Sequence, residues 1–132
     1  MPTKYPALNL GPLPVAQINA VLGTELEPGD VRVSQMAHEH MDAQHPADYP
    51  ICKPALLSVI AAPTFIGQDP NHALNFVLVK RVGLPNGRAV LVAIGLEPKG
   101  NTYGVRTAYL ISEKTISDRR AAGRLHIPPP TK

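Results

Sequence analysis

Three histidines lie close together in one short segment of the chain, VSQMAHEHMDAQHP at residues 33–46. They are His38, His40 and His45. Imidazole is the side chain that exchanges a proton most readily near neutral pH, so two of them on one element would make an acid–base site. His38 and His40 are two residues apart, and His40 and His45 are five apart. Zinc is disfavoured, because neither of these spacings is the i, i+4 pair that puts two ligands on one helical face. The segment therefore favours proton transfer without a metal or a cofactor.

A short helix over residues 33–46 would position these histidines. Ser34 is a suitable N-cap, because its hydroxyl can accept a hydrogen bond from the first turn. Pro46 cannot continue a helix, and it also moves the preceding residue out of the helical region of backbone space. We therefore expect His45 at the point where the helix ends and a loop begins.

The helical wheel predicts which histidine faces the core. At about 100° per residue, His38 and His45 nearly coincide, whereas His40 lies roughly 140° from His45. Met36 and Met41 lie on the same side as His40. We therefore expect His40 to border the buried face of the helix, and His38 and His45 to project from the opposite side. The alternative for each histidine is a solvated or hydrogen-bonded residue without a chemical role.

Length and composition indicate one domain with a modest core. The chain has 132 residues, of which 44% are hydrophobic, and it has one cysteine, which excludes an intrachain disulfide framework. No apolar run approaches the length of a membrane span, and the first residues do not form a signal-peptide pattern. We expect a proline-rich arm or linker at residues 1–13, a domain at 14–125 and a disordered tail at 126–132.

Charge is distributed unequally along the chain. Residues 1–79 contain three basic and seven acidic side chains, whereas residues 80–132 contain ten basic and three acidic ones. A basic half of this size indicates a polyanionic partner, for which phosphate is the obvious candidate. The alternative is that the basic residues of the C-terminal segment alone raise the count.

The hydrophobic pattern changes from helical to alternating along the chain. Helices are expected at residues 14–23, 33–46 and 54–62. Strands are expected at residues 31–33, 64–67, 74–82, 88–97 and 103–112, followed by a short helix at 113–121. The connectors at 83–87 and 98–101 are short and rich in turn residues, as in hairpins. The predicted fold is α+β, with two or three N-terminal helices packed on a three- or four-stranded antiparallel sheet.

Alternation along the last predicted strand places Tyr103, Thr107 and Tyr109 on one face of the sheet. Neither face of this strand is cleanly polar, so alternation alone leaves open which one borders a cleft. On the first long strand, Lys80 and Arg81 necessarily face opposite sides. One of them could therefore bind phosphate while the other is solvated.

Five short motifs follow one another along the chain. They are the helix ending His40-x-x-x-x-His45-Pro46, then PTFIG at 63–67, NFVLVKR at 75–81, LVAIGLE at 91–97 and RTAYLIS at 106–112. In this order and spacing, over about residues 15–125, the chain resembles the PBECR domains. These are the phage and polymorphic-toxin branch of the barnase–EndoU–colicin–RelE-like ribonucleases. His38 lies outside the family pattern, and residues 47–55 contain more prolines than the pattern predicts.

The resemblance implies a metal-independent endoribonuclease with a helix-then-sheet architecture. By position in the family pattern, the matching residues are His40, His45, Lys80, Thr107, Tyr109 and Ser112. Relatives act on RNA, often transfer RNA, and many are toxins held by a cognate immunity protein. Such a domain would act in the bacterial cytoplasm, in some cases as the C-terminal payload of a larger secreted or phage protein.

RNA supplies its own nucleophile, the 2′-hydroxyl. Cleavage by internal attack therefore needs a base, an acid, and positive charge or hydrogen-bond donors at the phosphate. We expect His45 to transfer a proton, with His40 as either a second proton carrier or a structural residue. Thr107 and Tyr109 would donate hydrogen bonds to the phosphate. The residues expected to bind the substrate are Lys80, Arg81, Arg106, Ser112 and Lys114.

Two other interpretations stay open. One is a non-catalytic module that binds nucleic acid or a protein, and the other is a phage structural or accessory domain that keeps the fold without activity. The chain has four tyrosines, two phenylalanines and no tryptophan. A platform that stacks single strands usually needs several aromatic rings on one face, which disfavours the binding module. If an immunity protein exists, we expect it to be acidic and to bind less tightly as salt rises.

Overall fold

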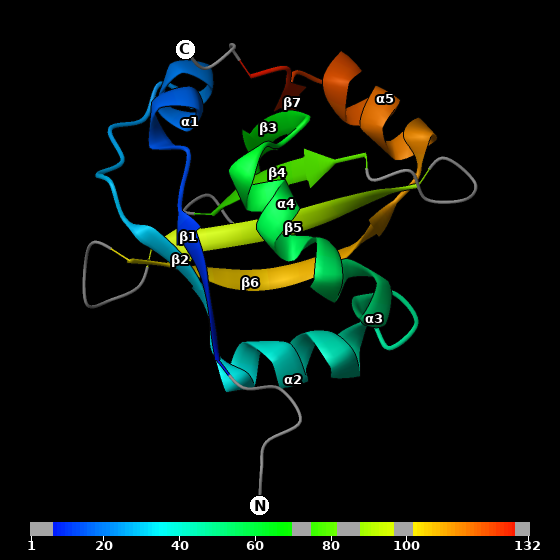
Figure 1. Ribbon diagram of the computed structural model, residues 1–132. Coiled ribbons are helices and arrows are strands. Elements are labelled where there is room, and N and C mark those ends of the chain that lie inside the picture. The colour runs from blue at the N-terminus through cyan, green and yellow to red at the C-terminus, as the bar shows by residue number, and fades with distance from the viewer. Residues whose placement is uncertain (1–6, 70–74, 82–87, 97–101, 129–132) are drawn as a thin grey trace, which may run out of the picture.

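A seven-stranded mixed sheet forms the centre of the computed structural model, which describes residues 7–69, 75–81, 88–96 and 102–128. The strands are β1 (Leu8–Pro12), β2 (Asp30–Val33), β3 (Phe65–Gln68), β4 (Phe76–Lys80), β5 (Ala89–Leu96), β6 (Thr102–Ile111) and β7 (Leu125–His126). Their spatial order is β1-β2-β6-β5-β4-β3-β7 (Figure 1). Neighbouring strands are antiparallel except β2 and β6, which run parallel. The long strands β5 and β6 therefore lie inside the sheet, with a paired strand on each side.

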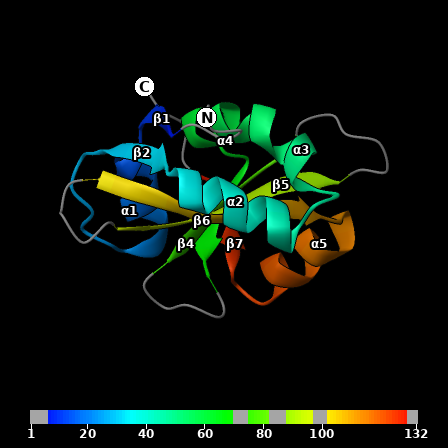
Figure 2. The same cartoon turned by 90° about the horizontal axis from the view of Figure 1, so that it is seen from below.

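Helices pack on both faces of this sheet. They are α1 (Val15–Leu22), α2 (Gln35–Gln44), α3 (Tyr49–Cys52), α4 (Leu56–Ala61) and α5 (Glu113–Ala121), with a 3₁₀ turn at Lys53–Ala55. Figure 2 shows α4 and α5 on opposite sides of the sheet. The larger core contains Ile18, Met41 and Leu56 from α1, α2 and α4, whereas α5 contributes Ile116 to a smaller apolar cluster on the second face. Since α5 is short, part of the second face beside α2 stays open.

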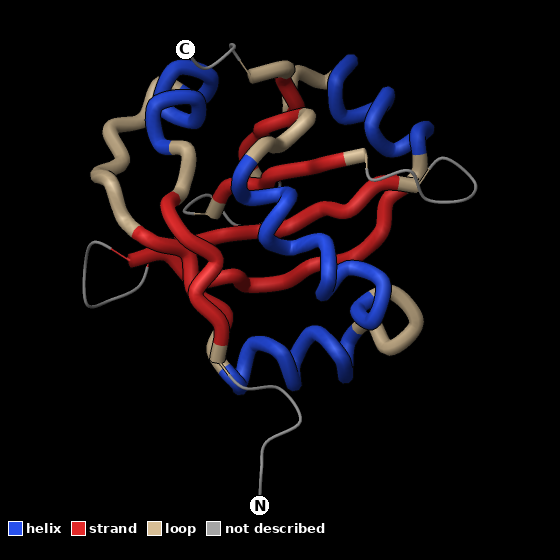
Figure 3. Tube along the Cα trace, viewed as in Figure 1, coloured by secondary structure: helices blue, strands red, loops and turns tan. Residues whose placement is uncertain are grey.

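The predicted sheet of three or four antiparallel strands is wrong, although the α+β class is correct. The alternating segments do form β3, β4, β5 and β6, but β1, β2 and β7 extend the sheet at its two sides. The parallel pairing of β2 with β6 joins segments far apart in the chain, so no local pattern signals it. Helices and strands are also interspersed, with β1 before α1 and β2 before α2, rather than grouped as N-terminal helices (Figure 3).

Some predicted features lie outside the described residues. They are the hairpin turns at 83–87 and 98–101, and the chain ends at 1–6 and 129–132. Within the segment expected as an arm, Leu8–Pro12 forms β1. At the other end, His126 pairs with Ile66 of β3.

Two short elements that begin with a proline in their first turn precede α4, and the second of them occupies the start of the helix predicted at 54–62. Pro50 lies in the first turn of α3, and Pro54 lies in the first turn of the 3₁₀ helix that follows. Proline is tolerated in a first turn but not inside a helix, so each proline starts a new short element. The helix itself begins only at Leu56, and Leu57 on its outer side is 58% exposed.

Serine N-caps begin both helices that border the open part of the second face. The Ser34 hydroxyl accepts a hydrogen bond from the N–H of Ala37 at 3.0 Å, which confirms the predicted cap of α2. Ser112 caps α5 in the same way, accepting from the N–H of Thr115 at 3.1 Å. The final helix has the predicted bounds, residues 113–121.

The wheel-based orientation of α2 is wrong for two of its histidines. His38 is fully buried, and its Nδ1 is hydrogen-bonded to the hydroxyl of Tyr49 on α3. His40 is exposed, and Met36 on the same side is 79% exposed. The buried face of α2 therefore runs through His38 and Met41. The tyrosine partner that makes burial of an imidazole tolerable lies in a different helix, so the pattern of α2 alone does not reveal it.

Cys52 is expected to be unreactive in the folded protein. Burial is the main reason that the pKa of its thiol is raised from 9.0 to about 12, and the nearby Asp48 carboxylate contributes to the rise. Because the thiolate is the reactive form, this shift suppresses reaction. A thiol reagent at pH 8 should therefore label the protein only after denaturant is added, as measured by mass spectrometry. The unfolded thiol ionises above about pH 9 while the folded one stays protonated, so its contribution to the free energy of unfolding decreases between pH 9 and 12. Native labelling as fast as in denaturant would contradict this burial.

Candidate functional site

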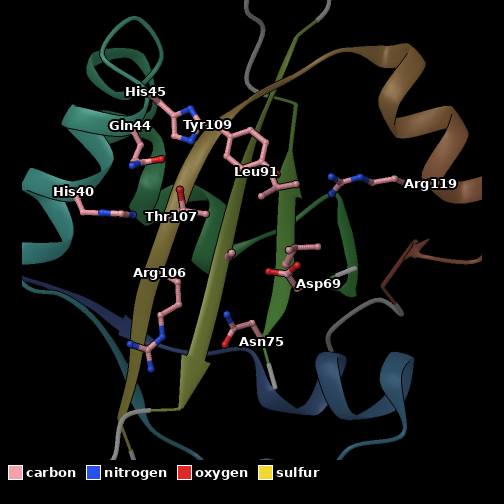
Figure 4. A pocket seen from close by; sticks show the side chains of 12 residues that line it. His40, Gln44, His45, Asp69, Asn75, Leu91, Arg106, Thr107, Tyr109 and Arg119 are labelled. Atoms are coloured by element: carbon pink, nitrogen blue, oxygen red, sulfur yellow. The ribbon is translucent and has the colours of Figure 1, made fainter. Parts of the chain in front are cut away.

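An open cleft of about 550 Å³ lies on the second face of the sheet, between α2 and α5 (Figure 4). Its floor consists of the apolar side chains of Val77, Leu91 and Ala93 on β4 and β5. Its walls are polar and come from separate parts of the chain: His40, Gln44, His45, Asp69, Asn75, Arg106, Thr107, Tyr109 and Arg119. The fold thus brings the histidine helix to the same cleft as the polar segment of β6.

A β-bulge at Arg106 turns that segment toward the cleft. In the pairing of β5 with β6, Ala93 lies opposite Thr107 and Ile94 opposite Val105, so Arg106 is the extra residue. Before the bulge, Val105 faces the larger core; after it, Thr107 faces the cleft. The prediction that Tyr103, Thr107 and Tyr109 share one face is therefore wrong, since alternation reverses at an inserted residue.

His45 is held against Tyr109 at one end of the cleft. Its imidazole is half-buried, and the two ring centroids lie 5.0 Å apart with a 30° angle between the ring planes. As predicted, His45 ends α2: its backbone is non-helical, and its N–H still donates to the carbonyl of Met41 at 2.8 Å. The imidazole therefore lies at a helix end whose backbone is fixed, beside the ring of Tyr109.

The turn after His45 ties this helix end to β6. The His45 carbonyl accepts hydrogen bonds from the N–H groups of Asp48 and Tyr49, at 3.1 and 2.9 Å. The Asp48 carboxylate in turn accepts a hydrogen bond from the N–H of Leu110 at 3.2 Å. Because Leu110 follows Tyr109 directly, these bonds fix the strand and the helix end to each other. Asp48 thus positions the imidazole relative to the tyrosine without lining the cleft itself.

The Arg106 side chain lies against Gly95 of β5. Its guanidinium donates to the carbonyl of Leu96 at 3.1 Å. A Cβ added to Gly95 would lie 2.8 Å from Arg106 Nε and 2.5 Å from the Asn75 side-chain oxygen. Only a residue without a side chain leaves room for these two polar groups at the lower end of the cleft.

Replacing Gly95 with alanine is therefore expected to displace Arg106 while leaving the strand intact, because the atoms it meets are the far ends of flexible side chains. With the polyanionic partner that the charge distribution predicts, binding of an RNA strand is expected to weaken about tenfold, the scale of one hydrogen bond to a charged group. Fluorescence anisotropy of Gly95→Ala, Arg106→Gln and the double variant measures this. In the double variant the alanine should add little beyond the effect of Arg106→Gln. Full additivity of the two changes would contradict the steric link between them.

Four polar residues that line the cleft were not predicted as site residues. Arg119 was counted only among the basic residues near the C-terminus, yet it lies on α5 three residues after the buried Ile116, and so on the same helical face. That i, i+3 spacing was the signal that could have identified it. Gln44, Asp69 and Asn75 also line the cleft, but their residue types are common at helix ends and turns and gave no signal.

Lys80 and Arg81, expected to bind phosphate, lie outside the cleft. The Lys80 ammonium lies on the face covered by α4, 3.5 Å from the carbonyl oxygen of Ser58. Arg81 forms two hydrogen bonds to the Glu113 carboxylate, at 2.9 and 2.7 Å, and lies 5.1 Å from the centre of the Phe65 ring. These bonds hold the pKa of Glu113 below its usual value, so the pair stays charged.

Ser112 and Lys114 also lie outside the cleft. Ser112 is the N-cap of α5, so its hydroxyl orients the helix that carries Arg119. Lys114 is exposed and pairs with Asp118 at 2.9 Å on the same helix. Of the residues expected to bind the substrate, Arg106 therefore lines the cleft, and the positive charge opposite it comes from Arg119.

The described residues contain no group of three or more His, Cys, Asp or Glu side chains that could hold a metal ion. In the same part of the chain, no helix is both long and apolar enough to cross a membrane. The comparisons with protein-family models, curated proteins and solved structures gave no match. The resemblance to PBECR domains therefore rests on the sequence pattern.

Proposed function

We propose that this protein is a metal-independent endoribonuclease that cleaves RNA by attack of a 2′-hydroxyl on the adjacent phosphate, leaving a 2′,3′-cyclic phosphate. The observation that carries the proposal is the contact of His45 with Tyr109 in one open cleft, next to Thr107 and Arg106. A proton carrier, hydroxyl donors and a cation are the groups that such a reaction requires.

Each of these groups has a role in the proposed reaction. His45 transfers one of the two protons, either from the attacking 2′-hydroxyl or to the departing 5′-oxygen. The hydroxyls of Thr107 and Tyr109 donate hydrogen bonds to the phosphate oxygens, whose negative charge increases as the nucleophile attacks. The Arg106 guanidinium supplies the positive charge beside them.

His40 is the proposed second proton carrier. Its imidazole is exposed, and it lines the same cleft as His45 from the preceding turns of α2 (Figure 4). Internal attack on RNA needs both a base and an acid. His40 and His45 lie on the same wall of the cleft, so they can supply these two groups. His38 takes no part in the proposal, because it is buried in the larger core.

The family resemblance also supports a proposal about partners. We propose that an acidic inhibitor protein neutralises the enzyme by covering the cleft between Arg106 and Arg119, and that the RNA is encountered in the bacterial cytoplasm. Complementary charge would speed the encounter, and binding would weaken as salt concentration rises.

The experiment that tests the proposed function compares three versions of one oligonucleotide: RNA, RNA with 2′-O-methyl groups, and DNA. All three present phosphates to the cleft, but only RNA has the nucleophile. RNA should be cut and the other two should be bound without cleavage. Cleavage of the 2′-O-methyl strand would contradict internal attack. Binding of all three with no cleavage of a broad set of RNAs would favour a non-catalytic binding module.

A further inference from the structure

One charged group in the cleft has an unused hydrogen-bond donor. Arg119 extends from α5 into the cleft from the side opposite α2 (Figure 4). Its Nη1 is buried, and within the described part of the chain it has no hydrogen-bond partner. The residue as a whole is only partly buried, so the guanidinium can still be reached through the cleft.

A buried guanidinium nitrogen without an acceptor is unfavourable, and Arg cannot relieve it by losing a proton. Such groups in folded proteins call for an explanation, such as a ligand that completes the site. The other basic side chains of α5 differ from Arg119. Lys114 is paired with Asp118, and Arg120 is exposed and lies 5.3 Å from the centre of the Phe65 ring. Arg119 also lines the cleft, so an anion bound there is a fitting partner for this guanidinium.

Arg106 reaches the same cleft from another element. The two guanidinium groups extend from β6 and from α5, on different sides of the cleft (Figure 4). Arg106 is the neighbour of Thr107, whereas Leu91 of the apolar floor lies between these residues and Arg119 (Figure 4). Two cations on different sides of one apolar floor match a strand with successive phosphates better than a single phosphate.

We infer that Arg119 is a second phosphate-binding residue, so that the cleft holds one RNA strand by two phosphates. The scissile phosphate lies at Arg106, Thr107 and Tyr109, and a neighbouring phosphate lies at Arg119. This inference rests on the proposed function for the identity of the strand. It specifies the substrate as a single strand with at least two phosphates, whose sugar and base lie over the apolar floor between the two cations.

The test measures binding of a 2′-O-methyl oligonucleotide, which cannot be cleaved, to Arg119→Gln at several salt concentrations. Loss of one phosphate contact on a single strand should reduce the slope of log affinity against log salt by about 0.7. Arg120→Gln is the matched control, because it removes the same charge from the next residue of α5 outside the cleft. Arg120→Gln should keep the slope of the unsubstituted protein. Equal slopes for all three proteins would overturn the inference.

A second measurement avoids substitution altogether, in case Arg119→Gln fails to fold. It compares two short 2′-O-methyl strands, a dinucleotide with one phosphate and a trinucleotide with two, on the unsubstituted protein. The trinucleotide should bind at least about tenfold more tightly, as expected for one additional charged hydrogen bond. Equal affinities would overturn the inference. Both measurements record binding, so if the slope depends on Arg119 while no RNA is ever cut, the phosphate site stands and the proposed ribonuclease function fails.

Discussion

Replacing His45 with alanine is expected to slow RNA cleavage by at least about 100-fold, because an acid or base role typically contributes 10²–10⁴-fold to a rate. The helix should survive the change, since the cap hydrogen bond of this residue is made by its backbone N–H. The measurement is the single-turnover cleavage rate of a fluorescent RNA strand, with thermal unfolding recorded in parallel. RNA affinity should change much less than the rate.

The matched control for this prediction is His126→Ala. His126 is exposed in β7 and does not line the cleft, so the same chemical change there should leave the cleavage rate within about twofold. A His45→Ala rate that cannot be distinguished from that of His126→Ala would remove His45 from the reaction.

Replacing Tyr109 with phenylalanine is expected to slow cleavage about 10- to 150-fold. The change keeps the ring, whose centroid lies 5.0 Å from that of the His45 ring, and removes only the hydroxyl. A hydrogen bond to a charged group contributes about 1.5–3 kcal/mol, which corresponds to that range of rates. The loss should appear in the single-turnover rate more than in RNA affinity, because the phosphate gains negative charge as the reaction proceeds.

Tyr103→Phe is the control for this second change. Its hydroxyl donates to the carbonyl of Glu27, and its ring is buried in the larger core, away from the cleft. Removing that hydroxyl should lower the free energy of unfolding and leave the cleavage rate of the folded protein unchanged. If both variants cut RNA at the unsubstituted rate, the Tyr109 hydroxyl has no part in the reaction.

Local chemistry made part of this fold predictable. A serine followed by helix-forming residues predicted the N-cap of α2, and the alternating segments predicted the strands at the centre of the sheet. The parallel pairing of β2 with β6 was not predictable, because its partners are separated by most of the chain. The same holds for the two-residue strand β7, which is too short to show alternation.

The site was predictable for the residues whose chemistry is read directly from their type and position. The proline after His45 indicated a helix end, and the structure places that end in one cleft with Thr107 and Tyr109. The orientation of His38 depends on Tyr49 in another helix, which no wheel of α2 contains. Similarly, the bulge at Arg106 arises from its pairing with β5, so the reversal of faces within β6 has no signal in the strand itself.

Cationic residues were the hardest to assign, because charge alone does not specify which face a strand or helix presents. Lys80 follows Val79, whose side chain lies on the second face, so the lysine side chain points to the α4 side. Arg119 reaches the cleft only because α5 packs through Ile116. A basic segment thus indicated a phosphate partner, but tertiary packing decides which of its residues can touch one.

The most direct measurement is the chemical nature of the RNA ends produced in the presence of EDTA. Internal attack without a metal predicts full activity and a 2′,3′-cyclic phosphate on every upstream fragment, identified by mass spectrometry. Fragments that carry a free 3′-hydroxyl, or activity that disappears with the chelator, would contradict a reaction run by the His45 and Tyr109 side chains.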